Sequence, residues 1–337
     1  MLVQCASLIE GVVTIMKRIG VLTSGGDAPG MNAAVRSVVR CGTGLGLEVV
    51  GIRRGYAGLL EQEFVELGAR SVANILHRGG TILGTARCEE MRLPEGLGKG
   101  VAALREASIE GLVAIGGDGT FHGAQDLAEL TDILIVGMPG TIDNDVYGTD
   151  FTIGFDTAVN TAVEAIDRIR DTAEAHQRLF FVEVMGRTRG FIAVDVAVAC
   201  GAEDVLVPEV RTDLDELCAN IQAQFAGGKR ASIIVVAEGD DAGRAFEVAH
   251  VVAGRLEMDY RVCVIGHVQR GGAPSARDRL LASRLGAAAV RTLGEGRTDV
   301  MVGEIGGEIV ETPLEQTWSR RKELDTGMLQ LMRTLAR

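Results

Sequence analysis

Aspartates follow two apolar runs of the sequence, and their spacing suggests metal and proton chemistry. Asp118 stands between glycines in "IGGDGT", whereas Asp143 and Asp145 stand two residues apart in "GTIDND". Grouped carboxylates repel one another unless they share a metal ion or a proton, so packing alone does not favour them. A Mg²⁺ ion held mostly by phosphate oxygens and water needs only one or two carboxylates, and another can accept a proton from a hydroxyl nucleophile. Phosphoryl transfer requires this division of labour.

Glycine-rich turns give a second, less specific signal. The stretch "TSGGDAPGMN" (23–32) predicts a strand, a tight turn and a helix beginning near Met31. Such a turn can bring backbone N–H groups to an anion, but it can equally serve only to connect a strand and a helix. Asp118 has a similar alternative as a helix-capping or turn residue. The chain contains no G-x-x-x-x-G-K-[ST] motif, so it has no P-loop.

Basic residues recur near the ends of expected strands and helices. His267 and Arg270 lie in "GHVQRGG" after the run "VCVI", and the nearby basic residues include Arg178, Arg187 and Arg261. A single arginine is usually a solvated surface group. Several arginines in a chain of net charge -12 are more typical of a phosphate clamp. His267 has the alternative of a hydrogen-bonded core histidine.

Composition limits the classes of protein to consider. A chain of 337 residues, 47% hydrophobic and 24% charged, is typical of a globular protein with two domains. The net charge of -12 argues against nucleic-acid binding. The six cysteines are scattered without a C-x-x-C pair, which indicates reduced thiols and a cytoplasmic protein. No apolar run reaches the eighteen residues of a membrane span. Residues 1–15 lack the features of a signal peptide, and we expect them to form an N-terminal extension.

Eight short apolar runs, each followed by a turn, must position these side chains. Continuous apolar runs without polar alternation are typical of parallel strands covered on both faces. The expected fold is therefore α/β and doubly wound, with ligands bound beyond the carboxyl ends of the strands. The longest helical pattern covers 154–176 and separates two lobes. The expected strands are 18–24, 48–53, 112–117, 133–138, 179–184, 204–208, 232–237 and 262–267.

Seven ordered motifs between about Lys17 and Glu311 resemble those of the 6-phosphofructokinase family, of the ATP-dependent type. They are "GVLTSGGDAPGMNAAVR", "RGGTILGTAR", "IGGDGT", "PGTIDNDVYGTDFTIGFDTA", "EAIDRIRDTAEAHQR", "VEVMGR" and "GHVQRGG". The resemblance implies Mg²⁺-dependent transfer of phosphate from ATP to the 1-hydroxyl of fructose 6-phosphate in glycolysis. It also implies two doubly wound α/β lobes with mainly parallel sheets, and a homotetramer in which some arginines reach a neighbouring subunit's site. The ATP and Mg²⁺ lobe would comprise 16–153 and about 268–310, and the sugar-phosphate lobe 154–267 and about 311–337.

The resemblance also implies roles for individual residues. Asp143 would accept the hydroxyl proton, Asp118 would hold Mg²⁺, and Arg87 would bridge the transferring phosphoryl group. Thr141 and Asp145 would complete the catalytic site. The donor site would comprise Gly26, Arg87, Cys88, Gly117, Asp118, Gly119 and Thr120. The substrate site would comprise Thr141, Ile142, Asp143, Arg178, Met185, Gly186, Arg187, Glu238, Arg261, His267, Val268, Gln269 and Arg270.

Two glycines bear on the choice of phosphoryl donor. Pyrophosphate-using relatives typically carry Asp at the position of Gly119 and Lys at that of Gly140. Glycine leaves room for a nucleotide α-phosphate, whereas an aspartate would fill and repel that space, so we expect ATP. A pyrophosphate-dependent or donor-flexible enzyme stays open, as does a wider range of sugar phosphates such as sedoheptulose 7-phosphate.

Two other classes of protein fit the sequence less well. A catalytically silent sensor should have lost at least one of Asp118, Asp143 or Arg87, and all three are present. A dehydrogenase should carry G-x-G-x-x-G and an acidic residue after the next strand, which the sequence lacks.

A second, regulatory site is a further expectation from the resemblance. It would bind effectors such as purine diphosphates or phosphoenolpyruvate between subunits. Gly227 stands where the regulated bacterial enzymes usually carry a basic residue, so a modified or absent response stays open. The possible effector residues are Arg36, Arg40, Arg170, Glu203, Lys229 and Arg230.

Overall fold

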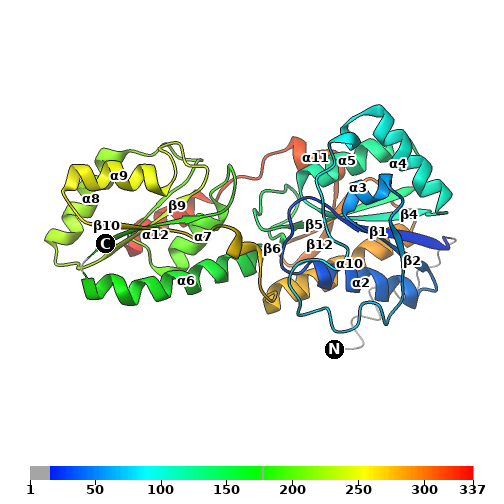
Figure 1. Cartoon of the computed structure of the whole chain (residues 1–337), viewed down its shortest axis with the longest axis horizontal. Coiled ribbons are helices and arrows are strands. Elements are labelled where there is room, and N and C mark those ends of the chain that lie inside the picture. The colour runs from blue at the N-terminus through cyan, green and yellow to red at the C-terminus, as the bar shows by residue number, and fades with distance from the viewer. Residues whose placement is uncertain (1–15, 177, 337) are drawn as a thin grey trace. The chain divides into compact units, whose positions relative to one another are not determined.

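A computed structural model describes residues 16–176 and 178–336 of the chain, which divides into two compact units (Figure 1). Unit 1 contains the residues up to Ile142, Val146–Asp156 and Arg270–Lys322. Unit 2 contains Asp143–Asp145, Thr157–Gln269 and the residues from Glu323 onward. The expected extension, residues 1–15, lies outside the described residues.

Unit 1 is built on an eight-stranded sheet with the order β12-β11-β5-β4-β1-β2-β3, to which β6 adds by pairing with β5. Its central strands are parallel, and only the edge strands β12 and β3 pair antiparallel. The strands are β1 (Arg18–Thr23), β2 (Glu48–Ile52), β3 (Phe64–Leu67), β4 (Gly111–Gly116), β5 (Leu134–Thr141), β6 (Ile153–Gly154), β11 (Val300–Ile305) and β12 (Glu308–Pro313).

Helices cover both faces of this sheet, as the buried apolar strands require (Figure 1). One face carries α2 (Met31–Gly44) and α10 (Ala276–Gly294), which pack against each other. The other carries α3 (Gly55–Leu60), α4 (Pro94–Glu106), α5 (Asp118–Ala128) and α11 (Leu314–Ser319), with the short helix η1 (Glu89–Arg92) beside α4.

Unit 2 has a smaller sheet of four parallel strands in the order β10-β7-β9-β8. Its strands are β7 (Leu179–Val184), β8 (Asp204–Leu206), β9 (Ser232–Ala237) and β10 (Tyr260–Val264). Helices α8 (Leu214–Ala226) and α9 (Ala245–Leu256) lie on one face, and α6 (Phe155–His176), α7 (Phe191–Cys200) and α12 (Thr326–Leu335) on the other (Figure 1). The short helix η2 (Gly266–Arg270) follows β10.

The structure confirms the doubly wound α/β fold, and each of the eight expected runs overlaps a strand. The antiparallel hairpin of β11 and β12 was not expected, although Gly306 and Gly307, both with positive φ, mark its turn. Because β12 pairs with β11 and α11 packs on α5, residues 311–322 cluster with unit 1. The expected division had placed this stretch in the sugar-phosphate lobe.

No helix in the described part of the chain is both long and apolar enough to cross a membrane.

Candidate active site

The predicted donor-binding residues of unit 1 gather where three neighbouring parallel strands end. Strands β5, β4 and β1 are adjacent, so the turns after them share one edge of the sheet. A Cβ on Gly116 would lie 2.2 Å from Thr120 Oγ1 and 2.6 Å from the Ser24 carbonyl oxygen, so only glycine allows this approach. A Cβ on Gly117 would lie 3.6 Å from Thr141 Cβ. The structure therefore brings together the turns that the sequence had singled out.

Helix α5 begins at Asp118, directly after Gly117, and its first two residues, Asp118 and Gly119, are exposed. The unbonded N–H groups at a helix start and the helix dipole favour an anion such as a phosphate. Among the described residues no group of three or more His, Cys, Asp or Glu side chains could hold a metal ion by itself. The exposed Asp118 carboxylate suits a Mg²⁺ ion that is held mainly by phosphate oxygens and water, since such an ion needs only one or two carboxylates.

A buried tyrosine that the sequence did not reveal supports the start of α5. The Tyr56 hydroxyl donates a 2.6 Å hydrogen bond to the carbonyl oxygen of Thr120, and burial raises the pKa of this phenol. Tyr56 lies on the short helix α3, so this contact ties α3 to the first turn of α5. A tertiary contact of this kind has no local sequence signal.

We expect Tyr56→Phe to lower the free energy of unfolding by about 1 kcal/mol, because it removes one buried hydrogen bond and little volume. Urea unfolding of the wild type and the variant, followed by circular dichroism, measures the difference. Tyr147→Phe is a matched control at a half-buried tyrosine of unit 1, whose hydroxyl accepts a longer, exposed hydrogen bond of 3.2 Å from Arg320. Equal stability of all three proteins would contradict a supporting role for Tyr56.

Two predicted arginines flank the turn that follows β1. The guanidinium of Arg270 lies against Gly26, where an added Cβ would be 2.7 Å from Nη1, and it donates to the carbonyl oxygen of Asp27 at 3.2 Å. Arg87 is exposed on a segment that Thr85 ties to the Gly25 carbonyl oxygen. Cys88, the next residue, packs against the core of unit 1. Arg270, expected in the substrate clamp, thus lies beside the predicted donor loop.

The predicted catalytic aspartate of unit 2 is buried and paired. The Asp143 side chain is 1% exposed, and its Oδ2 lies 3.2 Å from Nε of Arg187. Ile142 before it is also buried, so that only its main chain is placed to meet a ligand. Asn144 has a φ of 53°, a left-handed conformation, and Asp145 is half-buried.

Glu238 holds the main chain of the loop that carries Arg187. Its Oε1 accepts the N–H groups of Gly186 at 3.3 Å and of Arg187 at 2.7 Å. Both residues have positive φ, 144° and 54°, so the carboxylate stabilises a backbone that is strained at Arg187. Sequence reasoning missed Gly239, where a Cβ would lie 2.0 Å from the carbonyl oxygen of Arg187. The isolated glycine after a strand was the available signal.

Gln269 connects Met185 of the predicted substrate site to helix α6. Its buried Oε1 accepts the N–H of Met185 at 2.8 Å, and its Nε2 donates to the carbonyl oxygen of Ala158 at 3.4 Å. His267 and Val268 on η2 are exposed. Unit 2 therefore contains one connected group of predicted site residues, which are Asp143, Met185–Arg187, Glu238 and Gln269.

Arg178 and Arg261 lie at the opposite end of the same sheet. Arg178 directly precedes β7, and Arg261 pairs with Phe180, near the start of that strand. Met185 and Glu238 follow the carboxyl ends of β7 and β9. A six-residue strand such as β7 is about 20 Å long, so these arginines cannot grip a ligand held at the carboxyl ends. The structure does not bring the whole predicted clamp together within unit 2.

The possible effector residues fall into two groups. In unit 2, the Glu203 carboxylate forms ion pairs with Arg170 at 3.8 Å and with Lys229 at 3.4 Å. Arg230, next to Lys229 in the sequence, is exposed. Arg36 and Arg40 lie one turn apart on α2 in unit 1, and burial together with the charge of Arg40 lowers the pKa of Arg36. Gly227, which the resemblance aligns with a basic residue of the regulated bacterial enzymes, is the C-cap residue of α8.

These loops lie within a stretch of the chain that matches a family of known proteins. A family model described as Phosphofructokinase matches residues 18–293. The chain belongs to the phosphofructokinase family. The match begins at β1, runs through the strands of unit 2 and ends within α10.

Curated phosphofructokinases resemble the chain over nearly its whole length. The ATP-dependent 6-phosphofructokinase 1 of Thermus thermophilus is 59% identical over 321 residues, which is 95% of this chain and 100% of that relative. The ATP-dependent 6-phosphofructokinase of Halothermothrix orenii is 48% identical over 331 residues, with the same coverage.

Solved phosphofructokinase structures share the fold. Phosphofructokinase from Saccharomyces cerevisiae has a TM-score of 0.85 and 35% identity, covering 95% of this chain and 48% of that one, so the chain spans about half of the yeast protein. A pyrophosphate-dependent phosphofructokinase from Marinobacter aquaeolei has a TM-score of 0.81 at 23% identity, covering 94% and 91%. At that identity the likeness concerns the fold alone.

Proposed function

We propose that the protein transfers the terminal phosphoryl group of ATP to the 1-hydroxyl of D-fructose 6-phosphate. The products are ADP and D-fructose 1,6-bisphosphate, and the reaction is the committed step of glycolysis. The observation that carries this proposal is the buried Asp143, paired with Arg187, at the carboxyl end of β5. The names of the relatives, ATP-dependent 6-phosphofructokinase, agree with it.

The described residues suggest how each part of the reaction proceeds. Asp143 accepts the proton as the 1-hydroxyl oxygen forms its bond to phosphorus, while the bond from phosphorus to the ADP oxygen breaks. The N-terminus of α5 and the guanidiniums of Arg87 and Arg270 stabilise the charge on the phosphates. Glu238 fixes the loop of Met185–Arg187 against the sugar, with Thr141 and Asp145 beside the reacting group.

Asp118 is the residue that we propose as the Mg²⁺ ligand, and the ion supplies charge neutralisation for the donor phosphates when bound. Chelation with EDTA should therefore abolish turnover with ATP, and excess Mg²⁺ should restore it. Asp118→Asn should raise the Mg²⁺ concentration needed for half-maximal rate by about tenfold or more. An unchanged Mg²⁺ requirement would remove Asp118 from the metal site.

The first experiment is an assay of purified protein with fructose 6-phosphate and Mg²⁺, with ATP in one reaction and pyrophosphate in another. Turnover with ATP alone supports the proposal and the roles of Gly119 and Gly140. Turnover with pyrophosphate would favour the alternative, a pyrophosphate-dependent or donor-flexible phosphotransferase. Absence of turnover with both donors would overturn the enzyme assignment.

We infer that Arg178 and Arg261 grip the 6-phosphate bound to a neighbouring copy of the chain in a homotetramer. Their place at the amino ends of the unit 2 strands supports this, because the carboxyl-end site of the same unit lies about 20 Å away. Arginine is suited to the contact because its planar guanidinium binds phosphate oxygens in pairs.

A mixing experiment tests these shared sites. Asp143→Asn and Arg261→Ala variants should each be poorly active alone at low fructose 6-phosphate. Dissociated and reassembled together, they should recover activity, because some sites then combine an intact Asp143 with an intact Arg261 from the other chain. Mixing two batches of the same variant is the control. Activity equal to the sum of the separate variants would contradict the shared-site arrangement.

A further inference from the structure

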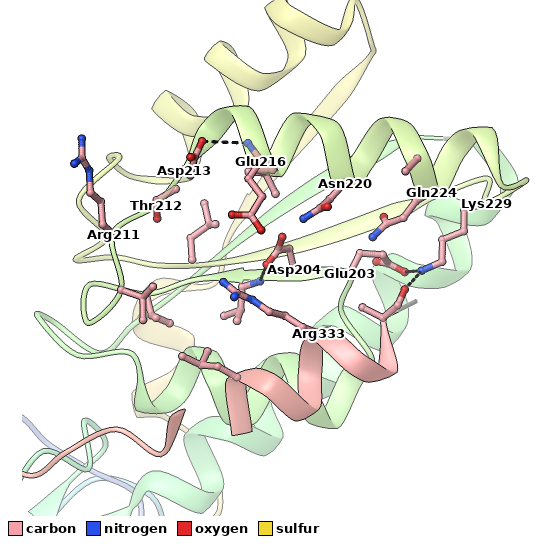
Figure 2. A pocket seen from close by; sticks show the side chains of 18 of the residues that line it. Glu203, Asp204, Arg211, Thr212, Asp213, Glu216, Asn220, Gln224, Lys229 and Arg333 are labelled. Atoms are coloured by element: carbon pink, nitrogen blue, oxygen red, sulfur yellow. Dashed lines mark hydrogen bonds and ion pairs between the residues drawn. The ribbon is translucent and has the colours of Figure 1, made fainter. Parts of the chain in front are cut away.

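A cavity of about 550 Å³ lies in unit 2 between α8, β8 and α12 (Figure 2). Its volume falls in the range of small-molecule sites. None of the residues that we assign to catalysis, donor or sugar-phosphate binding lines it. Glu203 and Lys229, of the possible effector set, lie at one end, where Lys229 pairs with Glu203 and donates to the carbonyl oxygen of Ala336 at 2.9 Å.

Two helices each turn one face toward this cavity. The lining positions of α8 recur every three or four residues and include Glu216, Asn220 and Gln224. Those of α12 are Leu329, Arg333 and Ala336 at the cap, which follow the same period. Residues at this spacing share one side of a helix. The cavity therefore lies between one face of α8 and one face of α12, and β8 lines it from a third side.

Some of the charged groups at the cavity already have partners. Glu203 is paired with Lys229, and Asp213 caps α8 by accepting the N–H groups of Asp215 at 2.9 Å and Glu216 at 3.1 Å. Asp204, Glu216, Arg211 and Arg333 make no ion pair within 4.0 Å among the described residues, although Asp204 accepts the N–H of Val205 at 2.9 Å. Figure 2 shows the Arg211 guanidinium directed away from Asp204, so two carboxylates and one guanidinium, that of Arg333, lie together in this part of the cavity.

The positions of these groups favour a cation next to the carboxylates. Figure 2 shows the Asp204 and Glu216 side chains directed toward one another, with the Arg333 guanidinium beside Asp204. Burial raises the pKa of Asp204 and Glu216 acts in the same direction, while the Val205 N–H, Arg333 and the Asn220 side chain act against them. An ammonium group between the two carboxylates would stabilise the ionised form of both. A polyphosphate would instead meet two carboxylates, which disfavours a nucleotide here.

We propose that this cavity binds an α-amino acid with an aliphatic side chain. The ammonium group would lie between Asp204 and Glu216, and the carboxylate would lie on Arg333. The aliphatic side chain would pack on the apolar wall formed by Leu206, Val207 and Leu329. Because α12 carries both Arg333 and part of this wall, the bound amino acid would join α8 to α12.

Isothermal titration calorimetry with leucine tests the proposal on the whole wild-type chain. Two probes of nearly the same shape separate the two charges: 4-methylpentanoate lacks the ammonium group, and leucinamide lacks the carboxylate. We expect leucine to bind and each probe to bind about tenfold more weakly or worse, since each loses a charge-assisted contact. Equal affinities for all three, or no binding of leucine up to about 10 mM, would overturn the proposal.

Matched substitutions on unit 2 identify the site. Asp204→Asn preserves side-chain volume and should weaken leucine binding about tenfold or more. Asp215→Asn is the control, because Asp215 lies on α8 with its side chain 91% exposed and pairs with Arg255 outside the cavity. Equal weakening by both variants would overturn the assignment. If Asp204→Asn fails to fold, the comparison of the three ligands on the wild type still decides, and none of these measurements depends on turnover.

Discussion

Asp143→Asn lowers the rate of fructose 1,6-bisphosphate formation by about 10²-fold or more at saturating ATP and fructose 6-phosphate. An amide cannot accept the hydroxyl proton, yet it has the size of the carboxylate that it replaces. Because Asp143 is buried beside Arg187, this substitution removes the proposed base without opening a void. A coupled spectrophotometric assay of bisphosphate formation measures the effect.

Binding must be separated from chemistry to interpret that result. Fructose 6-phosphate affinity, measured by titration without a donor, should stay within a few-fold of the wild type, since the role that we propose for the Asp143 carboxylate is to accept the proton. Asp259→Asn, before β10 at the other end of the unit 2 sheet, serves as the control variant. Turnover within a few-fold of the wild type in Asp143→Asn would show that another group accepts the proton.

Gly119→Asp lowers turnover with ATP by roughly 10²-fold, because it places a carboxylate at the end of α5 that we propose binds the donor phosphates. The structure shows that this change is sterically tolerated, since a Cβ on Gly119 has no atom within 4 Å. The loss should therefore reflect charge and space at the donor rather than misfolding. Steady-state kinetics with ATP and with pyrophosphate, alongside thermal unfolding, separates these causes.

Two other variants define the effect of Gly119→Asp. Gly119→Asn has nearly the same size without the charge, so a much smaller loss in this variant would identify repulsion as the cause. Gly140 differs, because its Cβ would lie 2.9 Å from Ile115 Cγ2 and 3.3 Å from Met31 Cε, so Gly140→Lys requires these side chains to move. A Gly119→Asp variant as active with ATP as the wild type would contradict the donor role of this position.

The parallel strands could be predicted from the sequence because strands covered on both faces need continuous apolar runs. The hairpin of β11 and β12 was missed because β12 is an edge strand and both strands are only partly buried, as the exposed Glu308 and the half-buried Glu304 show. Its Gly-Gly turn was the signal that could have revealed it. Sequence periodicity thus identifies the centre of a sheet better than its edges.

The candidate site could be predicted by residue type and by order along the chain, but its contacts could not. Asp118 and Asp143 follow strands, so their location at strand ends was predictable. The Tyr56 hydroxyl on Thr120 and the approach of the Arg187 carbonyl to Gly239 join segments that are distant in sequence. Tertiary contacts of this kind depend on how the loops pack, which local patterns do not encode.

The placement of Arg178 and Arg261 has a consequence for how the protein behaves on dilution. If each carboxyl-end site completes its phosphate clamp with arginines from another copy, a separated chain holds two incomplete halves rather than one complete site. Activity per mole of chain would then fall below the concentration at which the copies dissociate, and the sugar phosphate, by bridging two copies, would hold them together. The location of these two arginines at the amino ends of their strands would thereby make the activity per chain depend on the protein concentration.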